Sequence, residues 1–156
     1  MDRYLMTPDG HKRLKEELSR LKAERPRIVR EIAAAREHGD LSENAEYHAA
    51  KDRQGLTEAR ILELEAKLGG AEVIDTSTLS GDRVQFGATV SIVDEDTEAE
   101  STYQIVGADE ADASEGRLSI TSPLARALVG RSTGDSVELE TPGGRHTYEI
   151  TAVLYG

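Results

Sequence analysis

REHGDLSENAEY, residues 36–47, lies between two long segments that both carry helical heptad patterns. The stretch is too short for anything but a hairpin turn, so the two segments should fold back on each other as an antiparallel pair of helices. This arrangement places residues 39–43 at the far tip of the pair. We therefore expect two carboxylates, Asp40 and Glu43, to be presented at the end of a long helical arm.

The segment before the turn is predicted to be a helix that packs by a coiled-coil seam. Thr7 can cap its start, Pro8 suits the first helical position, and Gly39 can end it in a left-handed conformation. Pro26 should bend the helix near residues 22–26. The seam follows alternating steps of four and three, a spacing typical of coiled coils. Its members are Leu14, Leu18, Leu21, Arg25, Ile28, Ile32 and Ala35.

The segment after the turn predicts a second helix, beginning at Asp40 to Ser42 and ending at Gly69-Gly70. Ile61, Leu64 and Leu68 should widen its apolar face at the far end. About thirty residues in each helix give an arm of roughly 45 Å. Its predicted seam is less regular than that of the first helix and consists of Ala45, Ala49, Asp52, Leu56, Ala59, Leu62 and Ala66.

The pattern changes to the two-residue period of strands after residue 75, so residues 1–75 are predicted to form the arm and 76–156 a separate globular domain. Pro142-Gly143-Gly144 predicts a hairpin turn, and residues 123–129 predict a short helix between Ser122 and Gly130. The fold class is α+β, a helical hairpin followed by a small antiparallel sheet with one short helix. The predicted strands are residues 83–86, 88–93, 101–106, 118–120, 136–140 and 146–153.

Charge and composition separate the same two parts. Residues 1–70 carry equal numbers of acids and bases, so residues 71–156 account for the whole formal charge of −11. An acidic domain lacks the cations that release counterions from nucleic acid, so any nucleic-acid contact should belong to the arm. The chain has no cysteine, no visible signal peptide and no apolar run of membrane-spanning length. We expect a soluble, cytoplasmic protein that makes no membrane contact.

Asp40 and Glu43 allow two interpretations. Asp40 could cap the second helix while Glu43 returns a bond to the backbone, as in a capping box, and spacing alone favours this interpretation. The two exposed carboxylates could instead share a Mg²⁺ ion, which proteins often hold with one or two carboxylates plus substrate phosphates and water. A zinc site with His38 and His48 ranks below both, because no recognised ligand spacing accompanies them. The residues alone leave the first two interpretations open.

Other polar residues near the tip are equally ambiguous. Arg36, Lys51 and Arg53 could form a basic collar for a phosphate backbone, or could be ordinary solvated positions. Tyr47 could stack on a base or pack across the hairpin. His11 and His146 lie outside the group of histidines and acids at the turn and are expected to be surface residues. The chain has neither a glycine-rich phosphate loop nor a nucleophile elbow, so a free-standing active site is not expected.

Four motifs carry a resemblance to a known family. REHGDLSENAEYHAA at 36–50, IVG at 105–107, SPLAR at 122–126 and TPGG at 141–144 closely resemble the Gre family of bacterial transcript-cleavage factors. The match runs from residue 6 to the final strand. The resemblance implies an antiparallel coiled coil followed by an FKBP-like domain. It also implies binding in the RNA polymerase secondary channel, and rescue of backtracked polymerase by cleavage of the RNA 3′ end.

The resemblance also assigns residues. It implies that Asp40 and Glu43 help the polymerase to hold a second Mg²⁺ ion, so that the factor is not itself an enzyme. We expect the free protein not to bind this ion, because two carboxylates alone hold Mg²⁺ weakly. The resemblance matches Arg36 to an RNA contact and Ser122-Pro123 to the docking surface for polymerase, with the factor acting as a monomer. Relatives often carry lysine at the position of Ser42, so this tip is less basic. Two alternatives remain, a regulator that blocks the channel without cleavage and a prolyl isomerase or chaperone.

Overall fold

The computed structural model describes residues 3–39 and 44–155, which form two compact units. The arm unit consists of Lys12–Gly70, and the sheet unit combines Arg3–His11 with Ala71–Gly156. The first turn of the first helix therefore belongs to the sheet unit, and the rest of that helix belongs to the arm. The domain boundary at residues 75 and 76 stays a prediction of the sequence.

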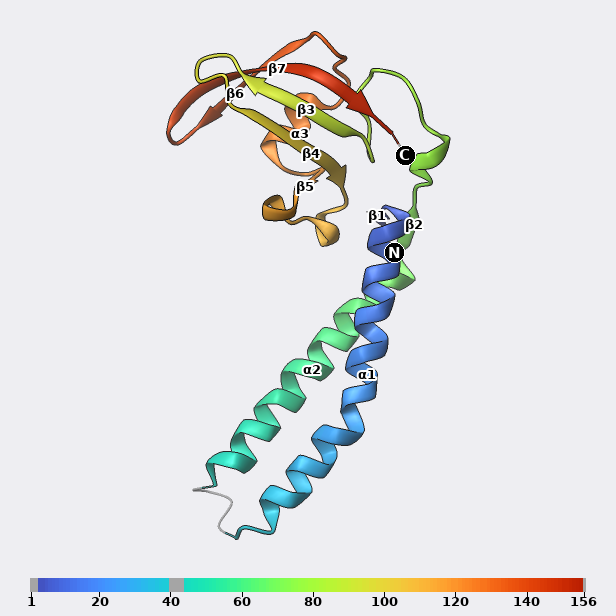
Figure 1. Ribbon diagram of the computed structural model, residues 1–156. Coiled ribbons are helices and arrows are strands. Elements are labelled where there is room, and N and C mark those ends of the chain that lie inside the picture. Colours follow the sequence, from blue (N-terminus) through green and yellow to red (C-terminus); the bar gives the residue numbers. More distant parts are fainter. Residues whose placement is uncertain (1–2, 40–43, 156) are drawn as a thin grey trace. The chain divides into compact units, whose positions relative to one another are not determined.

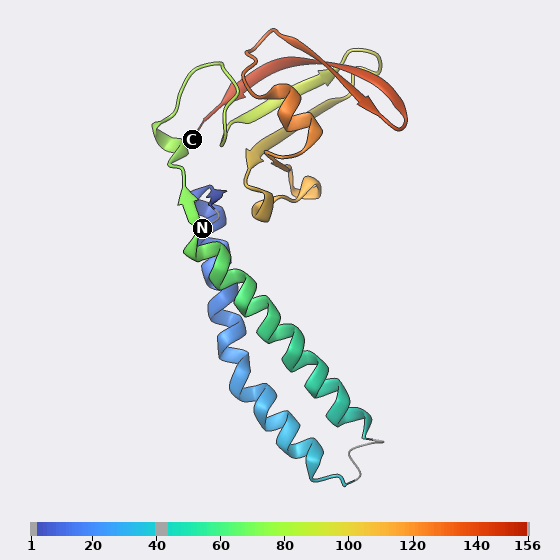
Figure 2. The ribbon, with the colours of Figure 1, turned by 180° about the vertical axis from the view of Figure 1, so that it is seen from behind.

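Two long helices, α1 (Pro8–Arg36) and α2 (Ala45–Gly69), run side by side in the arm unit (Figures 1 and 2). The predicted seam of α1 is largely confirmed. Its buried members are Leu14, Ile28, Ile32 and Ala35. Arg25 is exposed, and its guanidinium Nε lies 2.8 Å from the carboxylate of Glu58 on α2. Helix α1 continues through Pro26, and the bend expected there stays a prediction.

The predicted seam of α2 is wrong. Leu56 and Leu62 are 74% and 69% exposed. The side chains that turn inward repeat at steps of three and four along a neighbouring face. Two residues of this face, Gln54 and Thr57, are polar. A search for apolar residues at heptad spacing therefore does not find the face. Its members are Tyr47, Ala50, Gln54, Thr57, Ile61, Leu64 and Leu68, which are buried or half-buried.

The sheet unit contains a five-stranded sheet in the order β5-β4-β3-β7-β6 and a two-stranded parallel sheet of β1 (Tyr4–Met6) and β2 (Ala71–Val73). The remaining bounds are β3 (Thr89–Asp94), β4 (Glu100–Val106), β5 (Arg117–Ser119), β6 (Ser136–Thr141), β7 (Gly144–Leu154), helix α3 (Pro123–Leu128), and the short 3₁₀ helices η1 (Thr76–Thr78), η2 (Ala108–Glu110) and η3 (Ala113–Glu115).

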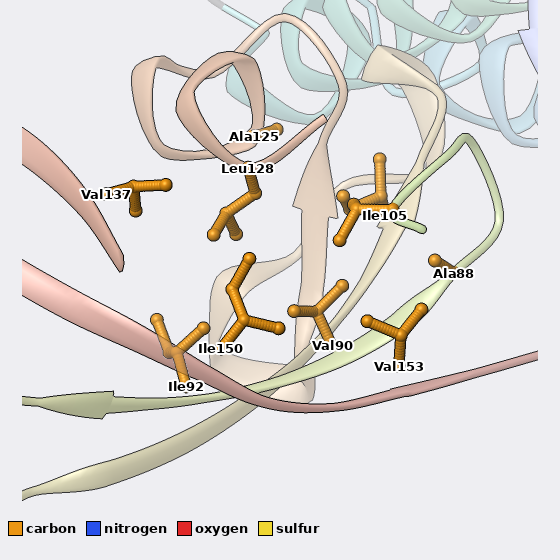
Figure 3. Close-up of a cluster of buried hydrophobic side chains, with 10 residues drawn as sticks. Ala88, Val90, Ile92, Ile105, Ala125, Leu128, Val137, Ile150 and Val153 are labelled. Atoms are coloured by element: carbon orange, nitrogen blue, oxygen red, sulfur yellow. The ribbon is translucent and has the colours of Figure 1, made fainter. Parts of the chain in front are cut away.

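The core lies between one face of this sheet and α3. Strand β3 alternates half-buried and buried residues, as its two-residue period predicts. Figure 3 shows Val90 and Ile92 of β3 and Ile150 of β7 pointing toward Leu128 of α3. The core comprises Val84, Ala88, Val90, Ile92, Ile105, Ala125, Leu128, Val137, Ile150 and Val153. The predicted α+β fold class is confirmed.

Three details differ from the sequence prediction. Residues 83–86 form no strand, because Arg83 makes only an isolated bridge with Ser132. Strands β1 and β2 were not predicted. The sheet is not wholly antiparallel, since β4 and β5 are parallel. The chain between them crosses over through η2 and η3, and such a crossover returns the next strand in the same direction as the first.

Glu110 attaches the start of α1 to the sheet unit. Its carboxylate is buried and accepts the backbone N–H of Thr7 at 3.0 and 3.2 Å and that of Gly107 at 2.7 Å. The Thr7 hydroxyl also donates to this carboxylate and accepts the N–H of Gly10 at 3.1 Å. A buried carboxyl group is tolerated where such hydrogen-bond partners surround it, and these bonds hold together segments that are 103 residues apart in sequence.

Gly107 allows this close approach, which gives a stability prediction. A Cβ added at Gly107 would lie 1.9 Å from the carbonyl oxygen of Leu5, whereas one added at the helical Gly55 meets nothing within 4 Å. Gly107→Ala should lower the free energy of unfolding by about 1–3 kcal/mol through overpacking. Gly55→Ala should raise it by about 1 kcal/mol through helix propensity. Urea unfolding followed by circular dichroism measures both, and equal stability of the two variants would contradict the packing described.

Asp94, at the end of β3, gives a pH prediction. The backbone N–H groups of Asp96 and Thr97 donate to Asp94 Oδ1 at 2.8 and 3.2 Å, and these bonds, with His146 as a smaller cause, hold the pKa of Asp94 below its usual range. His146 is partly exposed, and its Nδ1 lies 3.4 Å from Asp94 Oδ2.

A lowered folded-state pKa means that the ionised Asp94 stabilises the fold above its unfolded pKa, and that this contribution disappears as the pH falls through the folded value. Asp94→Asn keeps an acceptor oxygen but cannot ionise. The variant should therefore be less stable than the wild type at pH 7, and the difference should shrink in acid. Urea titrations across this pH range test it, and a difference that stays constant or grows in acid would be contrary to this assignment.

Candidate functional site at the tip of the helical hairpin

Helix α1 ends in tightened turns before the tip. The N–H groups of Glu37, His38 and Gly39 bond to the carbonyls three residues earlier, at 3.2, 3.1 and 3.3 Å. Gly39 has φ +103°, a positive value that favours glycine. The expectation that Gly39 ends the first helix in a left-handed conformation agrees with this geometry, although the last α-helical residue is Arg36.

Asn44 is the N-cap of α2. Its Oδ1 accepts the N–H of Tyr47 at 3.0 Å, and its Nδ2 donates to the carbonyl of Ala35 at 2.6 Å. The second helix therefore begins at Ala45, and the predicted start at Asp40 to Ser42 is wrong. Asp40 and Glu43 themselves lie outside the described residues. The capping of α2 that was considered for Asp40 is performed by Asn44.

Arg36 and Tyr47 meet just below the tip. The Arg36 guanidinium lies 5.8 Å from the centroid of the Tyr47 ring, and the His48 ring meets Tyr47 edge-on at 5.5 Å. Tyr47 also packs against the cluster formed by Ile28, Ile32 and Ala50. Packing across the hairpin is thus the interpretation of Tyr47 that the structure supports, and the ring supplies a surface for Arg36.

The predicted basic collar is divided between two grooves. Arg36 and Lys51 line a groove of about 340 Å³ whose other lining residues are Val29, Ile32, Ala33 and Gln54. Arg53 instead lines a second groove, of about 390 Å³, with Glu31 and Glu46, and forms an ion pair with Glu31. Two of the three predicted cations therefore share a surface, and the third is paired elsewhere.

No metal-binding cluster of three or more His, Cys, Asp or Glu side chains occurs in residues 3–39 and 44–155. His38 Nε2 lies 3.7 Å from Glu46, and His48 contacts Tyr47. Within the same ranges, no helix is long and apolar enough to cross a membrane.

The predicted docking residues Ser122 and Pro123 begin α3 in the sheet unit. The Ser122 hydroxyl accepts the N–H of Ala125 at 3.2 Å and donates to the carbonyl of Ser119 at 2.7 Å. Pro123 is the first residue of the helix. This confirms the predicted cap and shows that the Ser122 side chain has a structural role in addition to any contact with a partner.

Comparison with known proteins identifies the family. The family described as "Transcription elongation factor, N-terminal" matches residues 4–73, and that described as "Transcription elongation factor, GreA/GreB, C-term" matches residues 79–155. The chain belongs to the GreA/GreB family of transcription elongation factors. The family resemblance found from the tip motif is thereby confirmed.

Curated relatives match over nearly their whole length. The chain is 63% identical to the transcription elongation factor GreA of Beijerinckia indica, with 99% of each chain covered. It is 61% identical to the GreA of Phenylobacterium zucineum, with 98% of each covered. Among solved structures, the GreA factor homolog 1 of Thermus thermophilus is 26% identical over 98% of this chain and 99% of that chain, with a TM-score of 0.45.

Asn44 is the residue at the tip to which the sequence analysis gave no role. An available signal was its position directly before a run of helix-forming residues, where asparagine is among the preferred N-caps. The choice of Asp40 and Glu43 for that role obscured it. The bond from Asn44 to Ala35 could not be predicted in the same way, because it depends on how the two helices pack.

Proposed function

We propose that this elongation factor acts in the cytoplasm as a monomer that binds RNA polymerase and stimulates cleavage of the RNA 3′ end in backtracked complexes. Membership of the GreA/GreB family supports the polymerase as partner. The observation that favours a chemical role for the tip acids is the N-cap of α2. Because Asn44 caps this helix, Asp40 and Glu43 are not needed to begin it.

Asp40 and Glu43 are proposed to hold a Mg²⁺ ion together with carboxylates of the polymerase. Carboxylate oxygens are the donors that Mg²⁺ prefers, and the ion is commonly bound by one or two of them together with phosphates and water. A bound Mg²⁺ ion supplies charge stabilisation and activation of water for phosphodiester hydrolysis. Two carboxylates form only part of such a site, so the free factor should hold the ion weakly and not be an enzyme by itself.

Arg36 is proposed to contact the RNA. Its guanidinium carbon lies 5.8 Å from the centroid of the Tyr47 ring, a cation–π contact that occupies none of the N–H donors with a hydrogen-bond acceptor. Those donors suit a phosphate oxygen, and Lys51 lines the same groove. Ser122 and Pro123 are proposed to contact the polymerase from the sheet unit.

Asp40→Ala and Glu43→Ala test this function directly. Each should lower the rate of RNA cleavage in a stalled, backtracked complex by roughly 10²-fold or more, since a metal ligand contributes several kcal/mol to such a reaction. Binding to polymerase, measured by competition with the labelled wild-type factor, should persist. Glu46→Ala removes an exposed acid of the same arm and is the matched control, which should retain cleavage.

The outcomes separate the alternatives. Full cleavage by both variants would refute the role of the tip acids. Slowed transcription without cleavage by the wild-type factor would instead support a regulator that only occupies the channel.

A further inference from the structure

The side chain of Asn44 joins the ends of both helices of the arm. Its oxygen accepts the N–H of Tyr47, in the first turn of α2, at 3.0 Å. Its nitrogen donates to the carbonyl of Ala35, in the last turn of α1, at 2.6 Å. The partners fix the orientation of the amide, because a backbone N–H can only donate and a carbonyl can only accept.

An ordinary N-cap needs only the first of these two bonds. Serine, aspartate and asparagine are comparably good N-caps, because each offers an acceptor oxygen to the helix. Ionised aspartate has no donor, so its second oxygen would face the Ala35 carbonyl repulsively. A serine hydroxyl is a single short group and cannot span both helix ends. Asparagine alone among these preferred caps supplies an acceptor and a donor at separate atoms.

The second bond crosses the hairpin where its two helices end. Ala35 is buried at 4% exposure, and its carbonyl also accepts the N–H of His38 at 3.1 Å. The bond therefore connects the start of α2 to a well-packed turn of α1. It fixes the first turn of α2 directly to the last turn of α1.

We propose that Asn44 is a positioning residue, whose two-sided bond sets the geometry in which the tip presents Asp40 and Glu43. This inference rests on the proposed function of those two acids. Asn44 is bonded directly to Glu43 in the chain, so a displacement of its backbone displaces the adjacent carboxylate. A metal site assembled from two proteins requires this kind of support, because small misplacements of its ligands weaken it strongly.

Asn44→Asp and Asn44→Ser test the second bond alone. Both variants keep an oxygen that can accept the N–H of Tyr47, and both lose the nitrogen that donates to the Ala35 carbonyl. Both variants should bind polymerase within about threefold of the wild type and lower cleavage by about 10-fold to 100-fold. Rising Mg²⁺ concentration should restore part of the loss, because misplaced acids hold the ion more weakly. Ala45→Asp, which adds a charge at the neighbouring exposed position and keeps Asn44, is the control and should retain cleavage.

Further outcomes decide the inference independently of the proposed function. Wild-type cleavage by both Asn44 variants, with loss in Asp40→Ala, would overturn the positioning role and leave the function standing. A parallel loss of polymerase binding, or of helix content by circular dichroism, would also overturn it and indicate a purely structural cap. If Asp40→Ala and Glu43→Ala retain cleavage, the proposed function fails. The bond itself is still tested by slow hydrogen exchange of the Asn44 side-chain amide in NMR spectra, and fast exchange would contradict it.

Discussion

The arm depends on the register in which α1 packs against α2. Ion pairs cross the hairpin at three levels, between Glu17 and Arg60, Arg25 and Glu58, and Glu31 and Arg53. Arg60 binds Glu17 through two nitrogens, each at 2.9 Å, and this bond is the main cause that lowers the pKa of Glu17. Exposed pairs contribute little energy individually, but opposite charges at successive levels disfavour a shifted pairing. The register in turn brings Asn44 within reach of Ala35.

In the sheet unit, too, the structure depends on contacts between residues that are far apart in sequence. Helix α1 begins there, with Thr7 and Gly10 arranged around the buried carboxylate of Glu110. A Cβ at Gly10 would lie 1.7 Å from that carboxylate, so the first turn of the helix and η2 fit closely together. Helix α1 thus begins beside a hydrogen-bonded carboxylate, while its other end is held by the seam and by Asn44.

The sequence predicted those features that depend on local patterns. The α1 seam could be found because its members are mainly aliphatic, and the Pro142–Gly144 turn and the Ser122 cap follow from local chemistry. The α2 seam was missed because Thr57 is buried in place of an apolar residue. The three-residue strands β1 and β2 are too short for a periodic signal. The bonds from the Thr7 N–H to the Glu110 carboxylate and from the Asn44 side-chain nitrogen to the Ala35 carbonyl join groups that only the folded chain brings together. For the site, the family motif located the tip in the sequence. The sequence could not show that Arg36 and Lys51 line one groove and Arg53 another, because this depends on how the two helices pack.

We propose that a helical hairpin of fixed register carries two carboxylates to the reaction centre of the polymerase, and a factor with a shortened arm would show whether the length of the hairpin is required. Deleting Leu18–Glu24 from α1 together with Ile61–Lys67 from α2 removes one heptad from each helix, keeps both seams in phase and leaves the Arg25–Glu58 and Glu31–Arg53 ion pairs in place. The tip sequence is unchanged, and the arm becomes about 10 Å shorter. This variant is predicted to bind polymerase but to lose stimulation of RNA cleavage in backtracked complexes. Cleavage at the wild-type rate by the shortened factor would show that the tip acids do not need the full length of the arm to act.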